Sequence, residues 1–126
     1  ISCPELELGD ILIQEINQLI NTNLLAPIIL CRSIDNLKTI INVNSIVGLE
    51  HKFKRSIYSA TKWGLRGFSE SLKLESKAFI LDVYLSRVKT KPDYNEGMDA
   101  DYVADEIYNA FFSKKSKLIL DDRPIK

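Results

Sequence analysis

The chain has 126 residues, of which 45% are hydrophobic, and its seventeen basic and seventeen acidic side chains cancel. This length allows one compact domain over residues 1–126 but not two. Proteins that bind nucleic acid or an anionic membrane usually carry a basic excess, so the zero net charge supports neither kind of partner, and no apolar run is long enough to span a membrane.

Cys3 and Cys31 are too few for a disulfide framework, and their spacing matches no metal site. We therefore expect two reduced thiols, no bound metal and a cytoplasmic location. Residues 1–10 lack the basic start and apolar centre of a signal peptide, which agrees with that expectation.

Residues 10–32 have the periodicity of a helix, with apolar side chains recurring at spacings of three and four. Asp10 is placed to cap the start of this helix. Pro27 interrupts it, because proline has no N–H to donate to the carbonyl four residues earlier, which belongs to Asn23. The sequence therefore predicts a kink at this point.

Residues 38–45, KTIINVNS, are predicted to form a short strand because β-branched residues dominate the segment. The near-continuous apolar stretch predicts burial on both faces, as in a parallel sheet that helices cover on either side. After Gly48, residues 50–56 form a charged loop that contains the only histidine.

Residues 57–77 form the strongest predicted helix of the chain, with apolar side chains along one face. Gly64 and Gly67 weaken this helix locally. Glycines inside a helix often mark close packing against another element, and we expect such packing here.

The remaining residues predict a strand over 80–88, a polar loop over 89–97, a helix over 99–113 that Asp99 caps, and a last strand over 117–120. Helices and strands thus alternate along the whole chain. This order is typical of an α/β fold in which helical crossovers connect the strands of a parallel sheet.

Tyr58 and Lys62 stand four residues apart, so they lie on one face of the helix, and the lysine ammonium favours the phenolate form of the tyrosine. A tyrosine in this setting can give or take a proton. Ser45 ends a predicted strand, where ligands of parallel sheets bind, and its hydroxyl could donate a hydrogen bond to a substrate carbonyl. The pair by itself also occurs by chance, as part of an ordinary solvated helix face.

The wider stretch, YSATKWGLRGFSESLKLE with IINVNSIVG before it, strongly resembles the short-chain dehydrogenase/reductase family. That family has a strand ending in Ser, a loop, and then Tyr-x-x-x-Lys at the start of a long helix. NTNLLAPIIL upstream and VYLSRVKT downstream are similar to neighbouring segments of the same family. The resemblance implies a Rossmann-like, doubly wound fold, of which this chain covers the latter half to two-thirds.

By this resemblance Tyr58 is the general acid/base, and Lys62 binds the nicotinamide ribose. Ser45 positions the substrate carbonyl, and Asn23 supports a water that links Lys62 to solvent. The resemblance implies that Tyr58 and Asn23 also contact the cofactor. The reaction implied is hydride transfer between NAD or NADP and a small carbonyl or alcohol substrate, and the sequence does not choose between the two cofactors.

Val88 and Thr90 are implied as further cofactor contacts, Val88 near the nicotinamide and Thr90 at its carboxamide or phosphate. Leu85 and Ser86 stand where the family often has Pro-Gly. A second departure is larger: the chain contains no Gly-x-x-x-Gly-x-Gly turn to hold the cofactor pyrophosphate. The first βαβ portion of the fold is therefore missing from these residues.

The missing turn leaves an alternative open, in which the chain is a non-catalytic module that associates through its helices. Family members often pair through the helices that correspond to residues 10–32 and 57–77. The apolar faces here suit such a four-helix interface, and we expect a homodimer or homotetramer.

Overall fold

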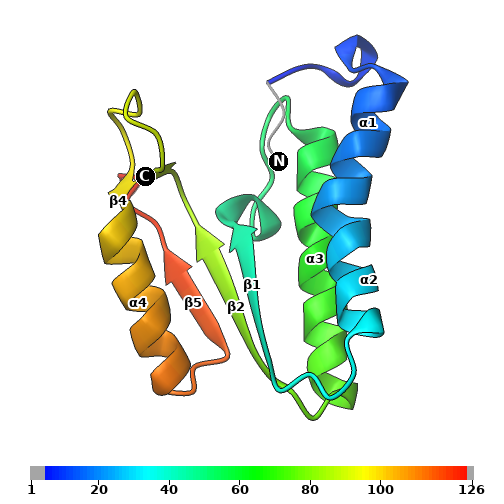
Figure 1. The fold of residues 1–126 in the computed structure, drawn as a ribbon. Coiled ribbons are helices and arrows are strands. Elements are labelled where there is room, and N and C mark those ends of the chain that lie inside the picture. Colours follow the sequence, from blue (N-terminus) through cyan, green and yellow to red (C-terminus); the bar gives the residue numbers. More distant parts are fainter. Residues whose placement is uncertain (1–4, 125–126) are drawn as a thin grey trace.

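The structure, a computed structural model, describes residues 5–124 (Figure 1). Its centre is a three-stranded parallel sheet with the strand order β1–β2–β5. These strands are Thr39–Ser45, Phe79–Leu85 and Lys117–Leu120. The pairing of β1 with β2 extends over both strands and places Ser45 opposite Leu85 at their carboxyl ends. The predicted parallel α/β sheet is confirmed.

The helix predicted over 10–32 is present but is divided into several parts. They are η1 (Leu8–Asp10), α1 (Ile13–Ile20), the π-helix η2 (Asn21–Leu25) and α2 (Ala26–Ser33). The prediction that Asp10 caps the helix is wrong, because α1 begins after Leu12, whose N–H donates to the Glu15 carboxylate at 2.9 Å. The kink predicted at Pro27 stays a prediction, and shortly before this residue the helix has a π-helical turn. Pro27 lies just after this turn, and the helix continues through it, since Leu25 before α2 is already helical and the Ala26 N–H donates to the Asn21 carbonyl.

Helices cover both faces of the sheet. α3 (Ser56–Glu75) packs on one face and is itself contacted by α1 and η2, and α4 (Ala100–Phe112) packs on the other face. Both crossovers, from β1 through α3 to β2 and from β2 through α4 to β5, advance in the same direction across the sheet. Because their helices lie on opposite faces, the two crossovers have opposite hands, and one of them is the uncommon left-handed form.

The apolar core lies between β2, β5 and α4. Its buried members are Leu81, Val83, Met98, Val103, Ala110, Leu118 and Leu120. Each strand contributes alternate residues to it, as the pleat requires. β2 is buried over its five central residues, since helices cover both of its faces.

A buried polar network joins α3 to the face of the sheet on which it packs. Asp82 on β2 is only 2% exposed, and its Oδ2 lies 2.7 Å from the Lys73 ammonium of α3. Its Oδ1 accepts hydrogen bonds from Ser69 at 2.6 Å and from Asn42 on β1 at 3.2 Å. Lys73 also donates to the Ser116 carbonyl at 3.1 Å, so one side chain links α3 to two parts of the sheet.

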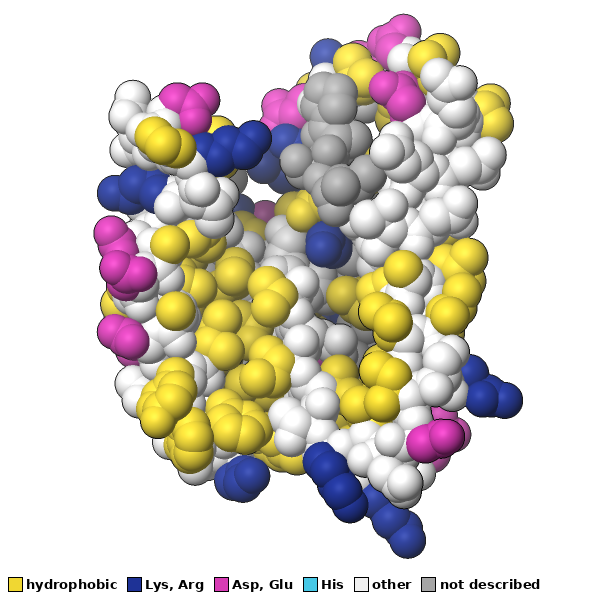
Figure 2. All heavy atoms as spheres, in the orientation of Figure 1, with side chains coloured by type: hydrophobic (Ala, Val, Ile, Leu, Met, Phe, Trp, Pro, Cys, Tyr) yellow, Lys and Arg dark blue, Asp and Glu magenta, His cyan; other side chains and the backbone are white. Residues whose placement is uncertain are grey.

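The prediction that both faces of the first strand are buried is wrong. Along β1 only alternate residues are buried, while Ile41 is 40% and Val43 55% exposed on the face opposite α3. The reason is that α4 packs over β2 and β5 and does not extend over β1. Figure 2 shows hydrophobic side chains gathered at the surface over the sheet and the helices on either side of it.

The strand predicted over 80–88 ends earlier, at Leu85. The chain then turns, and the short strand β3 (Val88–Lys89) pairs in parallel with β4 (Met98–Asp99). Gly97 makes this possible: its φ is +116°, and a Cβ on it would lie 2.6 Å from the Arg87 carbonyl oxygen. Only glycine fits such a position.

Within residues 5–124, no helix combines the length and the apolar character that crossing a membrane requires. No group of three acidic, histidine or cysteine side chains in that range could hold a metal. Cys31 is a free thiol whose pKa burial raises, and Cys3 lies outside the described residues.

The two glycines of α3 differ in their surroundings. A Cβ on Gly64 would lie 2.9 Å from Cδ2 of Leu24 in η2, so the predicted close packing is confirmed there. At Gly67 a Cβ would meet no atom within 4 Å, so the same prediction is wrong for that residue.

These surroundings predict different changes in stability for two similar substitutions. Gly67→Ala should raise the free energy of unfolding by about 1 kcal/mol, because alanine restricts the unfolded chain and nothing obstructs the methyl group. Gly64→Ala should gain less or lose stability, since Leu24 must move. Urea denaturation of both variants measures the difference, and equal gains would contradict the close approach at Gly64.

Candidate active site

The carboxyl end of β1 positions Ser45. The Asn44 side chain before it is buried, accepts the Ser45 N–H at 2.7 Å and donates to the Lys62 carbonyl at 3.1 Å. The Ser45 hydroxyl oxygen accepts the Val47 N–H at 3.2 Å and so starts the short 3-10 helix η3 (Ile46–Gly48). Its hydroxyl hydrogen is left to donate elsewhere.

The first turns of α3 carry Tyr58 and Lys62 on one face. The Lys62 ammonium lies 5.5 Å from the centre of the Tyr58 ring. Burial lowers the pKa of Lys62, and this amine makes no hydrogen bond or ion pair within the described part of the chain. Between the two, buried Thr61 donates to the Tyr58 carbonyl at 2.7 Å and holds this turn together.

The π-helix η2 brings Asn23 to the same part of α3. Its side chain is 5% exposed and donates to the Thr61 hydroxyl at 3.4 Å. A π-helical turn adds a residue to the helix and shifts the side chains that follow, and such turns are frequent at functional sites. Asn23 thus contacts Thr61, the residue directly before Lys62.

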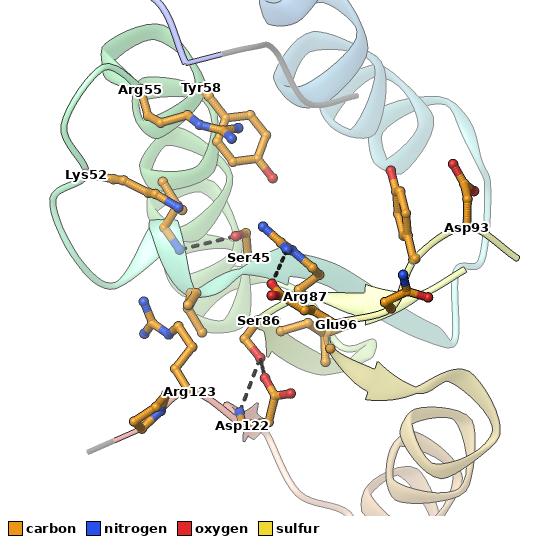
Figure 3. A pocket seen from close by; sticks show the side chains of 17 residues that line it. Ser45, Lys52, Arg55, Tyr58, Ser86, Arg87, Asp93, Glu96, Asp122 and Arg123 are labelled. Carbon is orange, nitrogen blue, oxygen red and sulfur yellow. Dashed lines mark hydrogen bonds and ion pairs between the residues drawn. The ribbon is translucent and has the colours of Figure 1, made fainter. Parts of the chain in front are cut away.

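A cavity of about 920 Å³ opens beside these residues (Figure 3). Ser45 and Tyr58 both line it, as do Leu85 and Ser86 at the end of β2. The remaining lining residues are Ile46, Val47, Lys52, Arg55, Arg87, Asp93, Tyr94, Asn95, Glu96, Gly97, Asp122, Arg123 and Pro124. The two hydroxyls predicted to act on a substrate therefore share one cavity at the carboxyl ends of the strands, the usual ligand position in such sheets.

The structure does not bring every predicted residue to this cavity. Val88 packs against the apolar core from β3, and Thr90 is exposed just after it. Neither belongs to the lining residues, and neither does Lys62 or Asn23. The cofactor contacts of Val88 and Thr90 stay predictions.

Sequence reasoning missed several residues of the site. Asn44 could have been found from its place, because a polar residue next to Ser45 in an apolar strand needs a hydrogen-bond partner. Lys52 and Arg55 were grouped in a charged loop, and nothing in their spacing showed that they face a cavity. Arg123 lines it through a tertiary contact, an ion pair with Glu50 at 2.7 Å.

Comparison with known proteins identifies the family. The chain belongs to the short-chain dehydrogenase family, whose profile matches residues 5–91. The 3-oxoacyl-[acyl-carrier-protein] reductase of Mus musculus is 46% identical over 61 residues, and that of Homo sapiens is 40% identical over 62. Each match spans 44% of this chain and only 26% of the relative. The resemblance noted in the sequence is confirmed.

Solved structures show the same fold. The bulky-bulky ketone specific alcohol dehydrogenase of Comamonas testosteroni superposes with a TM-score of 0.83 at 24% identity, over 94% of this chain and 51% of that one. A short-chain dehydrogenase from Sphingobium yanoikuyae, in complex with NADPH, gives 0.80 at 22% identity over 94% and 54%. The chain thus spans about half of each structure, and the Rossmann-like fold class is confirmed.

The buried amine of Lys62 leads to a prediction about stability. Because its pKa is lower in the folded chain, the folded state is penalised at every pH below that lowered value. The penalty fades as the pH rises toward the ordinary lysine pKa of about 10.4. Lys62→Met should therefore raise the free energy of unfolding at pH 7, by about 0.5–2 kcal/mol, and by less at pH 10.

Chemical denaturation at both pH values measures this effect. Lys77→Met, which removes an exposed lysine just after α3, is the control and should change little at either pH. A Lys62→Met variant that is less stable than the original protein at pH 7 would contradict the cost assigned to the buried amine.

Proposed function

We propose that a complete polypeptide containing this chain is an NAD(P)-dependent oxidoreductase that interconverts a carbonyl and an alcohol on a small molecule. The observation that supports this most directly is the shared cavity of Ser45 and Tyr58, with the Lys62 ammonium beside the Tyr58 ring. The names of the curated relatives point to a 3-oxoacyl group as one candidate substrate.

In the reducing direction the Ser45 hydroxyl donates a hydrogen bond to the substrate carbonyl oxygen and holds it in place. The Tyr58 hydroxyl gives its proton to the same oxygen as the alcohol forms. The Lys62 ammonium stabilises the phenolate that results, since an opposite charge nearby favours the ionised form. Asn23, which is hydrogen-bonded to Thr61, is proposed to bind the water that links Lys62 to solvent and through which Tyr58 regains its proton. In the oxidising direction Tyr58 takes the proton instead.

A bound nicotinamide dinucleotide, NAD or NADP, would supply or accept the hydride. The residues present fit its nicotinamide end, because the buried and unpaired amine of Lys62 suits ribose hydroxyls, with Val88 and Thr90 as further proposed contacts. They do not fit its pyrophosphate, since the sequence has no glycine-rich turn. We therefore assign activity to a polypeptide that also supplies such a turn, and we place it in the cytoplasm.

Replacing Tyr58 tests the proposed proton transfer. Tyr58→Phe removes only the hydroxyl. In the complete polypeptide, turnover of a ketone with NADH or NADPH should therefore fall by about 100- to 10,000-fold. The decline in cofactor absorbance measures the rate. Tyr108→Phe removes the same group from an exposed tyrosine of α4 and should leave the rate unchanged. Full activity of Tyr58→Phe would exclude the mechanism.

Association through the helices is a second proposal, and it is compatible with the first. The outer side of α1, η2 and α2 carries exposed apolar residues, among them Ile13, Leu25 and Ile29. Single exposed apolar residues are common on surfaces, but a continuous set along helices is typical of an interface. We propose that this side forms a homodimer or homotetramer.

A charge at this surface should prevent association. Ile29→Glu is expected to shift the protein from dimer or tetramer to monomer, which sedimentation velocity measures. Ile119→Glu is the matched control, because Ile119 on β5 has the same exposed fraction of 51% and lies outside these helices. If both variants kept the oligomer, the proposed interface would be wrong.

A further inference from the structure

One wall of the cavity carries two cationic side chains next to Tyr58. Arg55 immediately precedes α3, and Lys52 lies three residues earlier in the same loop. The Arg55 guanidinium carbon lies 5.7 Å from the centre of the Tyr58 ring. Figure 3 shows both cations on the Tyr58 side of the cavity, with Asp93 on the far side.

The other two cations of the cavity are neutralised by close partners. Arg87 pairs with Glu96 at 2.8 Å. Arg123 pairs with Asp121 at 2.6 Å and with Glu50 at 2.7 Å. Direct hydrogen bonds of this length satisfy a guanidinium. These arginines are therefore structural, and they leave little charge for a ligand.

Lys52 and Arg55 are compensated much less. Both approach a single carboxylate, that of Glu5, at 3.8 Å and 3.5 Å, which is longer than a charge-assisted hydrogen bond. The Arg55 side chain is only 20% exposed, and its Nε is buried without a hydrogen-bond partner in the described part of the chain. Two cations thus share one loosely held anion beside the proposed proton donor.

Because this Nε is inaccessible, a ligand in the cavity would meet the terminal nitrogens of Arg55, of which Nη2 lies 3.5 Å from the Glu5 carboxylate. A guanidinium binds planar oxyanions through two parallel hydrogen bonds, and an ammonium adds a point charge. We propose that Arg55 and Lys52 form an oxyanion subsite, an inference that rests on the proposed function. The substrate would then carry a carboxylate or a phosphate a few bonds from its carbonyl.

Glu5 then has a defined role. Its carboxylate lies where it competes with the oxyanion of the substrate for both cations. Removing its charge should strengthen binding of an anionic substrate, whereas removing Arg55 should weaken it. If Arg55 served only to hold the N-terminal segment through Glu5, both substitutions would act in the same direction.

The experiment compares an oxo-carboxylic acid with its methyl ester, and an oxo-phosphate with the corresponding alcohol, in the complete enzyme. For the charged substrates Arg55→Met should lower kcat/KM by about 10- to 100-fold, and Lys52→Met by less. Glu5→Gln should lower KM for the same substrates. The neutral substrates should respond much less to each of these changes, and among the three Arg55→Met should affect them most, since Arg55 also lies beside the Tyr58 ring. The charged substrate whose kcat/KM falls more in Arg55→Met, the oxo acid or the oxo-phosphate, identifies which oxyanion the subsite binds.

Lys54→Met is the matched control, because Lys54 belongs to the same loop, pairs with Glu7 and does not line the cavity. This substitution should leave kcat/KM unchanged for both the charged and the neutral substrates. Equal losses for acid and ester in Arg55→Met, or losses in both Arg55→Met and Glu5→Gln, would overturn the subsite.

Calorimetry and a ketone-reduction assay on the complete enzyme, with Tyr58 in place, separate the subsite from the reaction. Binding of the oxo acid that depends on Arg55, in an enzyme that reduces no ketone, would support the subsite and reject the proposed function. Reduction of neutral ketones, with acid binding that does not depend on Arg55, would support the function and reject the subsite.

Discussion

The ion pair between Asp82 and Lys73 is the contact on which the placement of α3 depends. A carboxylate that is 2% exposed has lost its hydration, which costs several kcal/mol unless an opposite charge and hydrogen bonds replace the water. Lys73 supplies the charge at 2.7 Å, and Ser69 and Asn42 supply the hydrogen bonds. All three partners must hold these positions together, so α3 has one favourable orientation on β1 and β2.

The proposed active site follows from that orientation. With α3 fixed, its first turns lie at the carboxyl end of β1, where Asn44 joins Ser45 to the Lys62 backbone. Close contact between Gly64 and Leu24 brings η2 against the same turns, and Asn23 reaches Thr61 there. Polar contacts thus position the hydroxyls, and the proposed subsite adds two cations, Lys52 and Arg55, to the same cavity.

Sequence patterns predicted the elements well where one physical signal dominated. The periodicity of α3, the β-branched run of β1 and the Asp99 cap of α4, which accepts the Asp101 N–H at 2.9 Å, all correspond to structure. Predictions failed where tertiary packing decides. The burial of Ile41 depends on how far α4 extends, and the pairing of β3 with β4 depends on a close approach to Arg87 that only Gly97 allows.

The sequence by itself determined the family, the parallel α/β order and the spacing that puts Tyr58 and Lys62 on one helical face, because these depend on local periodicity and on short motifs. Only the tertiary structure decided that Ser45 and Tyr58 share a cavity, that Asp82 is neutralised from α3, and that Arg55 lies half-buried beside Tyr58. Burial and charge compensation arise between segments far apart in the chain, and no local pattern encodes their distances.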